Sequence, residues 1–64
     1  MKSAYQIADE ILASVTQAIG MPDKVIRQTG MLTRVDENST YFAVTAPTDD
    51  GSEIVMYSVT VTRI

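Results

Sequence analysis

The side chains of this sequence that could do chemistry are its carboxylates. Of the 64 residues, eight are Asp or Glu, five are Lys or Arg, and none is His or Cys, which gives a formal net charge of −3. One pair falls on a predicted helix and the others fall in or beside predicted turns. In chain order the acidic residues are Asp9, Glu10, Asp23, Asp36, Glu37, Asp49, Asp50 and Glu53. Negative charge is therefore the densest polar feature of the sequence.

Paired carboxylates can act as acid and base in a glycosidase, but they do so inside a cleft. A domain of 64 residues has little room for a cleft, and without His it lacks the side chain that most often titrates near neutral pH. We therefore expect a protein that is not an enzyme, and no deep pocket that holds two carboxylates.

The run from Asp49 to Glu53 resembles a calcium loop only faintly, because it lacks the length and the alternating acidic spacing of an EF-hand. Zinc and copper sites need His or Cys, which are absent. We expect no metal and no cofactor. This run and Asp36–Asn38 are interpreted as polar turns, with the alternative that the turns present charge to a partner.

Composition narrows the class of partner. The basic residues are scattered and the pI is near 4.5, so we expect no direct binding of nucleic acid. No apolar run is long enough for a transmembrane helix, and Asp9 and Glu10 interrupt the only stretch that could serve as a signal peptide. A cytoplasmic location is the expectation. A domain this small buries only about 60% of its unfolded surface, which favours self-association.

Residues 4–19 are predicted to form an amphipathic helix. Ser3 and Gln6 have the spacing of a capping box, and Gly20 is the expected stop. Apolar residues recur at steps of three and four and form one stripe toward the core. The stripe consists of Ile7, Ala8, Ile11, Leu12, Val15, Ala18 and Ile19.

Three strands are predicted after the helix, over residues 24–35, 40–46 and 54–63. Apolar residues of both parities occur in the first strand, which indicates a bulge, and Gly30 is the natural place for it. Asp50-Gly51 is the strongest turn signal. Two sets of alternating residues are expected to face the helix: Phe42, Val44 and Ala46, and then Val55, Tyr57, Val59 and Val61.

This order of elements predicts an α+β fold, in which one N-terminal helix packs on a three-stranded antiparallel β-meander within a single domain, residues 1–64. The two turns of a meander lie at opposite ends of the sheet, about 23 Å apart for a strand of this length. With Asp9 and Glu10 toward the first turn and Asp23 toward the second, two acidic groups would share one rigid body. Such a body could occupy the basic DNA groove of a DNA-binding protein.

Tyr41 and Met56 are expected on the outer sheet face, where they could anchor a partner or a second copy, or be isolated exposed residues. The third strand is long, apolar and uncharged, so an uncovered edge there would invite pairing. A homodimer through this edge or face would add buried surface to a domain that is too small to form a large core by itself.

The whole profile resembles the small phage-encoded anti-CRISPR proteins that act on type I surveillance complexes. The shared features are a short acidic chain without His or Cys, one capped helix beginning Ser3-Ala4-Tyr5-Gln6, and a sheet with acidic turns. The resemblance implies binding to a Cascade-type complex and a block of DNA recognition. Mimicry of duplex DNA would use Asp9, Glu10, Asp36, Glu37, Asp49, Asp50 and Glu53. A steric block would use Tyr41 and Met56.

The competing class is a small self-associating structural or adaptor protein of phage or bacterial origin that uses its open sheet face. A mimic should be a monomer with a continuous negative face, whereas an adaptor should form a dimer that buries the Thr and Met side of the sheet.

Overall fold

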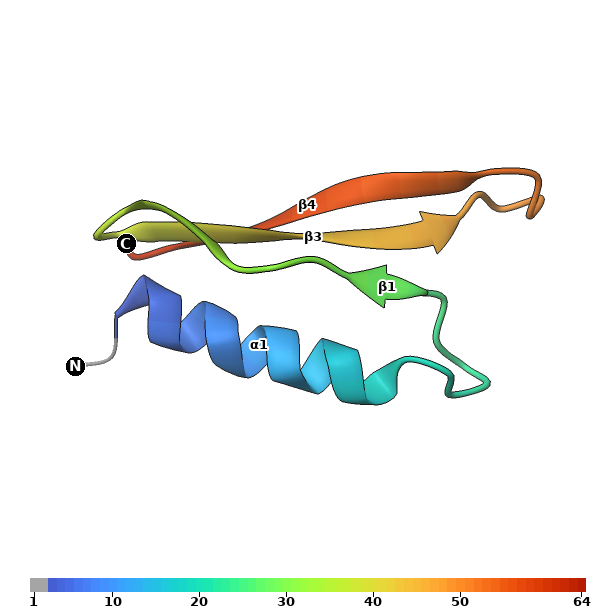
Figure 1. Cartoon of the computed structure of the whole chain (residues 1–64), viewed down its shortest axis with the longest axis horizontal. Helices are drawn as coiled ribbons and strands as arrows, with labels where there is room; N and C mark the ends of the chain where they lie inside the picture. Colours follow the sequence, from blue (N-terminus) through green and yellow to red (C-terminus); the bar gives the residue numbers. More distant parts are fainter. Residues whose placement is uncertain (1–2) are drawn as a thin grey trace.

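The computed structural model describes residues 3–64 as one helix below a single antiparallel sheet of four strands (Figure 1). The α+β class and the N-terminal helix were predicted. The elements are α1 (Ala4–Ala18), β1 (Gln28–Thr29), β2 (Thr33–Asp36), β3 (Ser39–Pro47) and β4 (Ile54–Thr62).

Helix α1 begins at the predicted capping box. The Gln6 backbone N–H donates to Ser3 Oγ at 3.2 Å, and the Ser3 backbone N–H donates to Gln6 Oε1 at 2.9 Å. These bonds occupy backbone donors that the first turn of a helix leaves without a partner. The helix ends one residue before its predicted limit, and Gly20 follows with a φ of +91°, a conformation that glycine adopts without steric cost.

The first predicted strand, residues 24–35, is interrupted, so the sheet has four strands rather than the three of the predicted αβββ meander. Because β4 pairs along the whole of β3, β1 and β2 share the other edge of β3. Thr29 pairs with Val44 and Thr33 pairs with Tyr41, so three residues on one side lie opposite two on the other. The extra residue lies between Gly30, whose N–H still donates to the Ala43 carbonyl at 2.7 Å, and Thr33, close to the predicted bulge. A second register shift occurs between Arg34 and Asp36.

Strands β3 and β4 form an unbroken hairpin from Ser39 opposite Thr62 to Pro47 opposite Ile54. Every second residue of β3 is buried toward the helix, with Phe42 fully buried, as the alternation predicted. The helix contributes its small residues to this core. The buried residues are Ala4, Ala8, Thr40, Phe42, Val44 and Ala46.

Helix α1 packs on β3 and also contacts the strands on either side of it, β4 and β1. Thr16 Oγ1 is 3.1 Å from Thr29 Oγ1 of β1, and the Arg34 guanidinium of β2 lies 4.9 Å from the centre of the Tyr5 ring. A helix about 10 Å wide covers only about two strand rows spaced about 4.8 Å apart, so the sheet is wider than the helix that packs on it.

The limited width of the helix corrects two predictions about burial. Ile7 and Ile11 were assigned to the buried stripe, but they lie on the flank of α1 away from β1 and are 37% and 39% exposed. The apolar side of β4 does face the helix layer, because Tyr57 pairs with buried Val44, yet Tyr57 is 49% exposed. An apolar surface therefore stays open between α1 and β4.

Candidate functional site

The predicted acidic groups lie at opposite ends of the hairpin. Asp36 and Glu37 lie at the β2–β3 turn, and Asp49 and Asp50 lie at the β3–β4 turn (Figure 1). Strand β3 has nine residues, so these turns are separated by about 26 Å. Helix α1 starts at the end that holds the β2–β3 turn (Figure 1). All seven acidic residues of the predicted binding set, including Asp9, Glu10 and Glu53, are exposed.

The carboxylate of Asp50 is the acceptor that organises the β3–β4 turn. Its Oδ1 accepts from Thr48 Oγ1 at 2.7 Å, from the Ser52 backbone N–H at 3.0 Å and from Ser52 Oγ at 2.8 Å. The Thr48 hydroxyl, together with the two Ser52 donors, lowers the pKa of Asp50 from 3.8 to about 2. Each donor stabilises the ionised form, so the turn needs a charged Asp50.

We expect this turn to give the protein an acid-sensitive element. Because the pKa of Asp50 is lower in the folded state, its contribution to the free energy of unfolding is complete above pH 3.8 and is lost as the pH falls toward 2. In urea titrations from pH 5 to pH 2, Asp50→Asn should lose less stability than the wild type. Asp49→Asn removes the same charge one residue away and is the control. Equal pH slopes for the wild type and Asp50→Asn would contradict the assignment.

Asp36 has a similar local function, because its Oδ1 accepts from the Asn38 backbone N–H at 2.8 Å. Asp23, by contrast, lies 3.6 Å from the ammonium of Lys24. Within residues 3–64, no hydrogen bond or ion pair engages the carboxylate of Glu37 or Asp49. Each acidic turn thus pairs one carboxylate that holds the turn with one exposed carboxylate that makes no hydrogen bond or ion pair to the described part of the chain, Glu37 in the first turn and Asp49 in the second.

Tyr41 and Met56 both lie on the outer sheet face, as predicted, with exposures of 37% and 71%. They are not neighbours. Tyr41 is opposite Thr60, whereas Met56 is opposite Thr45, four residues further along β3, or roughly 13 Å. Small residues separate the two side chains, so they act as separate contact points and not as one anchor.

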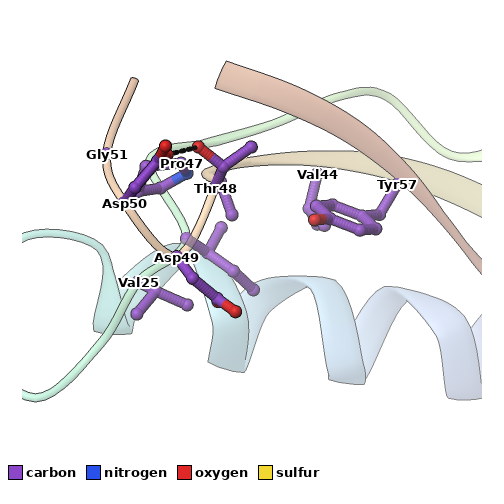
Figure 2. Close-up of a pocket in the computed structure, with 10 residues that line it drawn as sticks. Val25, Val44, Pro47, Thr48, Asp49, Asp50, Gly51 and Tyr57 are labelled. Carbon is purple, nitrogen blue, oxygen red and sulfur yellow. Dashed lines mark hydrogen bonds between the residues drawn. The ribbon is translucent and has the colours of Figure 1, made fainter. Parts of the chain in front are cut away.

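A hollow with a volume of 680 Å³ lies on the helix-facing side where the β3–β4 turn meets the segment after α1. Figure 2 shows the Tyr57 ring beside Val44, Asp49 near Val25, and Asp50 hydrogen-bonded to Thr48. Asp49 and Asp50 both line this hollow, which is open to solvent and is not the deep pocket that an acid–base pair needs. Asp50 stays ionised at neutral pH with its pKa near 2, so it cannot donate a proton there.

Sequence reasoning did not identify the apolar lining of this side as a candidate site. Smaller hollows continue from the first along α1, lined by residues that include Ile11 and Val15. Periodicity alone predicts the same burial for Ile7 and Leu12. It indicates which face of the helix is apolar, but it does not indicate how far the sheet extends beneath that face. Tyr57 could have indicated an open site in the sequence. Its hydroxyl makes it the only polar side chain among the helix-facing residues of β4, and the others are valines.

Across residues 3–64, no helix is long and apolar enough to cross a membrane, and no cluster of three acidic residues is placed to hold a metal ion. No family model, curated protein or solved structure matches this chain. What the fold and site define is a small α+β hairpin protein with an acidic turn at each end and an open hollow between the β3–β4 turn and the segment that follows α1.

Proposed function

We propose that this protein is a non-enzymatic inhibitor that binds a type I CRISPR surveillance complex and blocks recognition of target DNA. It would act in the cytoplasm of an infected bacterium. The proposal extends the resemblance of the whole sequence profile to small anti-CRISPR proteins. The observation that carries it is the display of exposed carboxylates at both ends of one continuous hairpin.

The geometry supports a charge-driven contact. The hairpin is held by nine consecutive residue pairs, so the separation of its ends is fixed, at about 26 Å. This is shorter than one turn of B-DNA, about 34 Å, so both ends could reach phosphate-binding positions in one groove. Glu37 and Asp49 are the residues we assign to these contacts, because Asp36 and Asp50 also hold their turns.

We expect the double variant Glu37→Gln, Asp49→Asn to bind a purified Cascade-type complex at least about tenfold more weakly than the wild type, because the charges that meet the basic groove are lost. The control is Ala13→Lys, Gln17→Lys, at two exposed positions of α1. Both double variants change the net charge from −3 to −1. Binding would be measured by biolayer interferometry, with competition by target duplex.

The control should keep most of the affinity, and wild-type binding should weaken steeply between 50 and 300 mM salt, since ions screen exposed charges over about 10 Å. Loss of affinity that is equal in the two variants would indicate a response to net charge and contradict a defined display. Failure of the wild type to compete with duplex DNA would overturn the proposed function.

A further inference from the structure

The chain exposes more surface than a compact protein of its size. Its accessible surface is 4878 Å², whereas folded monomers of 7.0 kDa have about 4,040 Å². Its radius of gyration is 12.8 Å, against about 10.7 Å for a compact chain of 64 residues. The excess is roughly 840 Å², close to the ~800 Å² that each partner contributes to a standard protein–protein interface.

Part of the exposed apolar surface lies on β4, where Ile54, Met56 and Tyr57 are exposed. This strand has no charged residue, proline or glycine, and it forms the outermost edge of the sheet (Figure 1). Tyr57 is 49% exposed on its helix-facing side, with Ile7 and Ile11 open on the nearest flank of α1. Proteins that stay monomeric usually cover or charge such an edge.

The backbone of β4 also has an unpaired edge. The hydrogen bonds at its two ends show which of its residues direct their N–H and C=O groups away from β3. The Thr48 N–H donates to the Glu53 carbonyl at 2.9 Å, and the Arg63 N–H donates to the Asn38 carbonyl at 2.8 Å. Because hydrogen-bonded pairs alternate in an antiparallel ladder, the odd-numbered residues of β4 aim their backbone groups at β3. The even-numbered residues aim outward, and within residues 3–64 no strand pairs with them. They are Ile54, Met56, Ser58, Thr60 and Thr62.

We propose that β4 pairs antiparallel with β4 of a second copy of this chain, about a two-fold axis that passes through Ser58. Ser58 would then face Ser58 of the second copy, with Met56 opposite Thr60 and Ile54 opposite Thr62. The backbone N–H and C=O groups of all these residues point away from β3. Each opposed pair could therefore exchange two backbone hydrogen bonds across the new contact.

Charge complementarity selects this register. The residues that bound β4 are Glu53 before it and Arg63 after it, and both are exposed. Pairing centred on Ser58 places Glu53 of each chain opposite Arg63 of the other, which gives two ion pairs at the ends of the new ladder. A register shifted by two residues would lose this match.

The same register covers the open apolar side. Tyr57 of one copy would lie opposite Val59 of the other, and Val55 opposite Val61, all on the helix-facing side. A two-fold axis normal to the sheet keeps both helices on one face, so the exposed flanks with Ile7 and Ile11 would face each other across the joined sheet. This contact goes beyond the proposed function and leaves Glu37 and Asp49 free at the turns.

The charge pairs give the first test, by sedimentation velocity on the full chain. The wild type should sediment as a dimer, twice 7.0 kDa, at 100 µM. Glu53→Arg alone and Arg63→Glu alone should each raise the dimer dissociation constant about tenfold, because like charges then face each other at both ends. The double variant Glu53→Arg, Arg63→Glu should restore dimerisation, and so should a mixture of the two single variants.

The absence of native Cys provides the second test. Hydrogen-bonded antiparallel pairs have Cα atoms about 5.5 Å apart, within the range that a disulfide can span. Ser58→Cys should therefore form a covalent dimer on mild oxidation. Thr33→Cys, an exposed position in β2 at the opposite edge of the sheet, should stay monomeric under the same conditions.

A monomeric wild type at 100 µM overturns the proposal. So does a dimer that is insensitive to Glu53→Arg, or one in which Thr33→Cys crosslinks and Ser58→Cys does not. A dimer would correct the expectation that a charge mimic is a monomer, but it would pair the β4 edge and leave the outer Thr and Met side of the sheet exposed. The two tests can be told apart, because the variants used for the proposed function keep Glu53, Arg63 and all of β4.

Discussion

Phe42→Ala is expected to lower the free energy of unfolding by about 3–5 kcal/mol. Phe42 is fully buried and is the largest such side chain in the core. Truncating a buried Phe typically costs about 3–5 kcal/mol, because transfer energy is lost and a cavity remains. A domain of 64 residues has a free energy of unfolding of about 3–10 kcal/mol, so the loss is a large fraction of the total.

The adjacent residue supplies the control. Tyr41 lies on the other face of β3 and is 37% exposed, so Tyr41→Ala should cost clearly less than Phe42→Ala. Both variants would be followed by circular dichroism during urea titration. A Phe42→Ala variant as stable as Tyr41→Ala would mean that the helix does not pack on this face of the sheet.

Thr40→Val is expected to stabilise the protein by about 1–2 kcal/mol. Thr40 is 1% exposed, and its hydroxyl has no hydrogen-bond partner among the described residues. Burying an unpaired hydroxyl costs about 1–3 kcal/mol in protein mutational data. Valine has the same shape and places a methyl group in this site, so the penalty disappears without a new cavity.

The control for Thr40→Val is the same substitution on the outer face. Thr60 is exposed there opposite Tyr41, so Thr60→Val should change the urea midpoint only slightly, within about 0.5 kcal/mol. Destabilisation by Thr40→Val would show that the hydroxyl has a partner in solution, such as a buried water, and would refute the unpaired assignment.

Much of the local structure could be predicted from the sequence. The capping box of Ser3 and Gln6, the turn at Gly51 and the burial of Phe42 depend on residues within a few positions of one another. Even the bulge near Gly30 was indicated by mixed parity, although its consequence, the split into β1 and β2, was not. Whether the strand continues across a bulge depends on pairing with β3, which is a long-range interaction.

The acidic residues illustrate the same division at the candidate site. Their positions at the turns followed from the sequence, since Asp and Gly favour turns. The sequence did not distinguish Asp50 from Asp49, yet Asp50 accepts from Thr48 and Ser52 while Asp49 faces the groove (Figure 2). The difference depends on the path of the turn backbone, which sets the side chain that meets the local donors.

The sequence by itself therefore determined the class of fold, the two acidic turns and the faces of the strands, because alternation, capping and turn chemistry act over short range. Only the tertiary structure decided where the helix lies across the sheet. The helix packs on β3 and contacts β4 and β1, but it is narrower than the sheet, so Ile7, Ile11 and Tyr57 remain partly exposed. Surface that one copy cannot cover is the physical reason that a second copy is expected there.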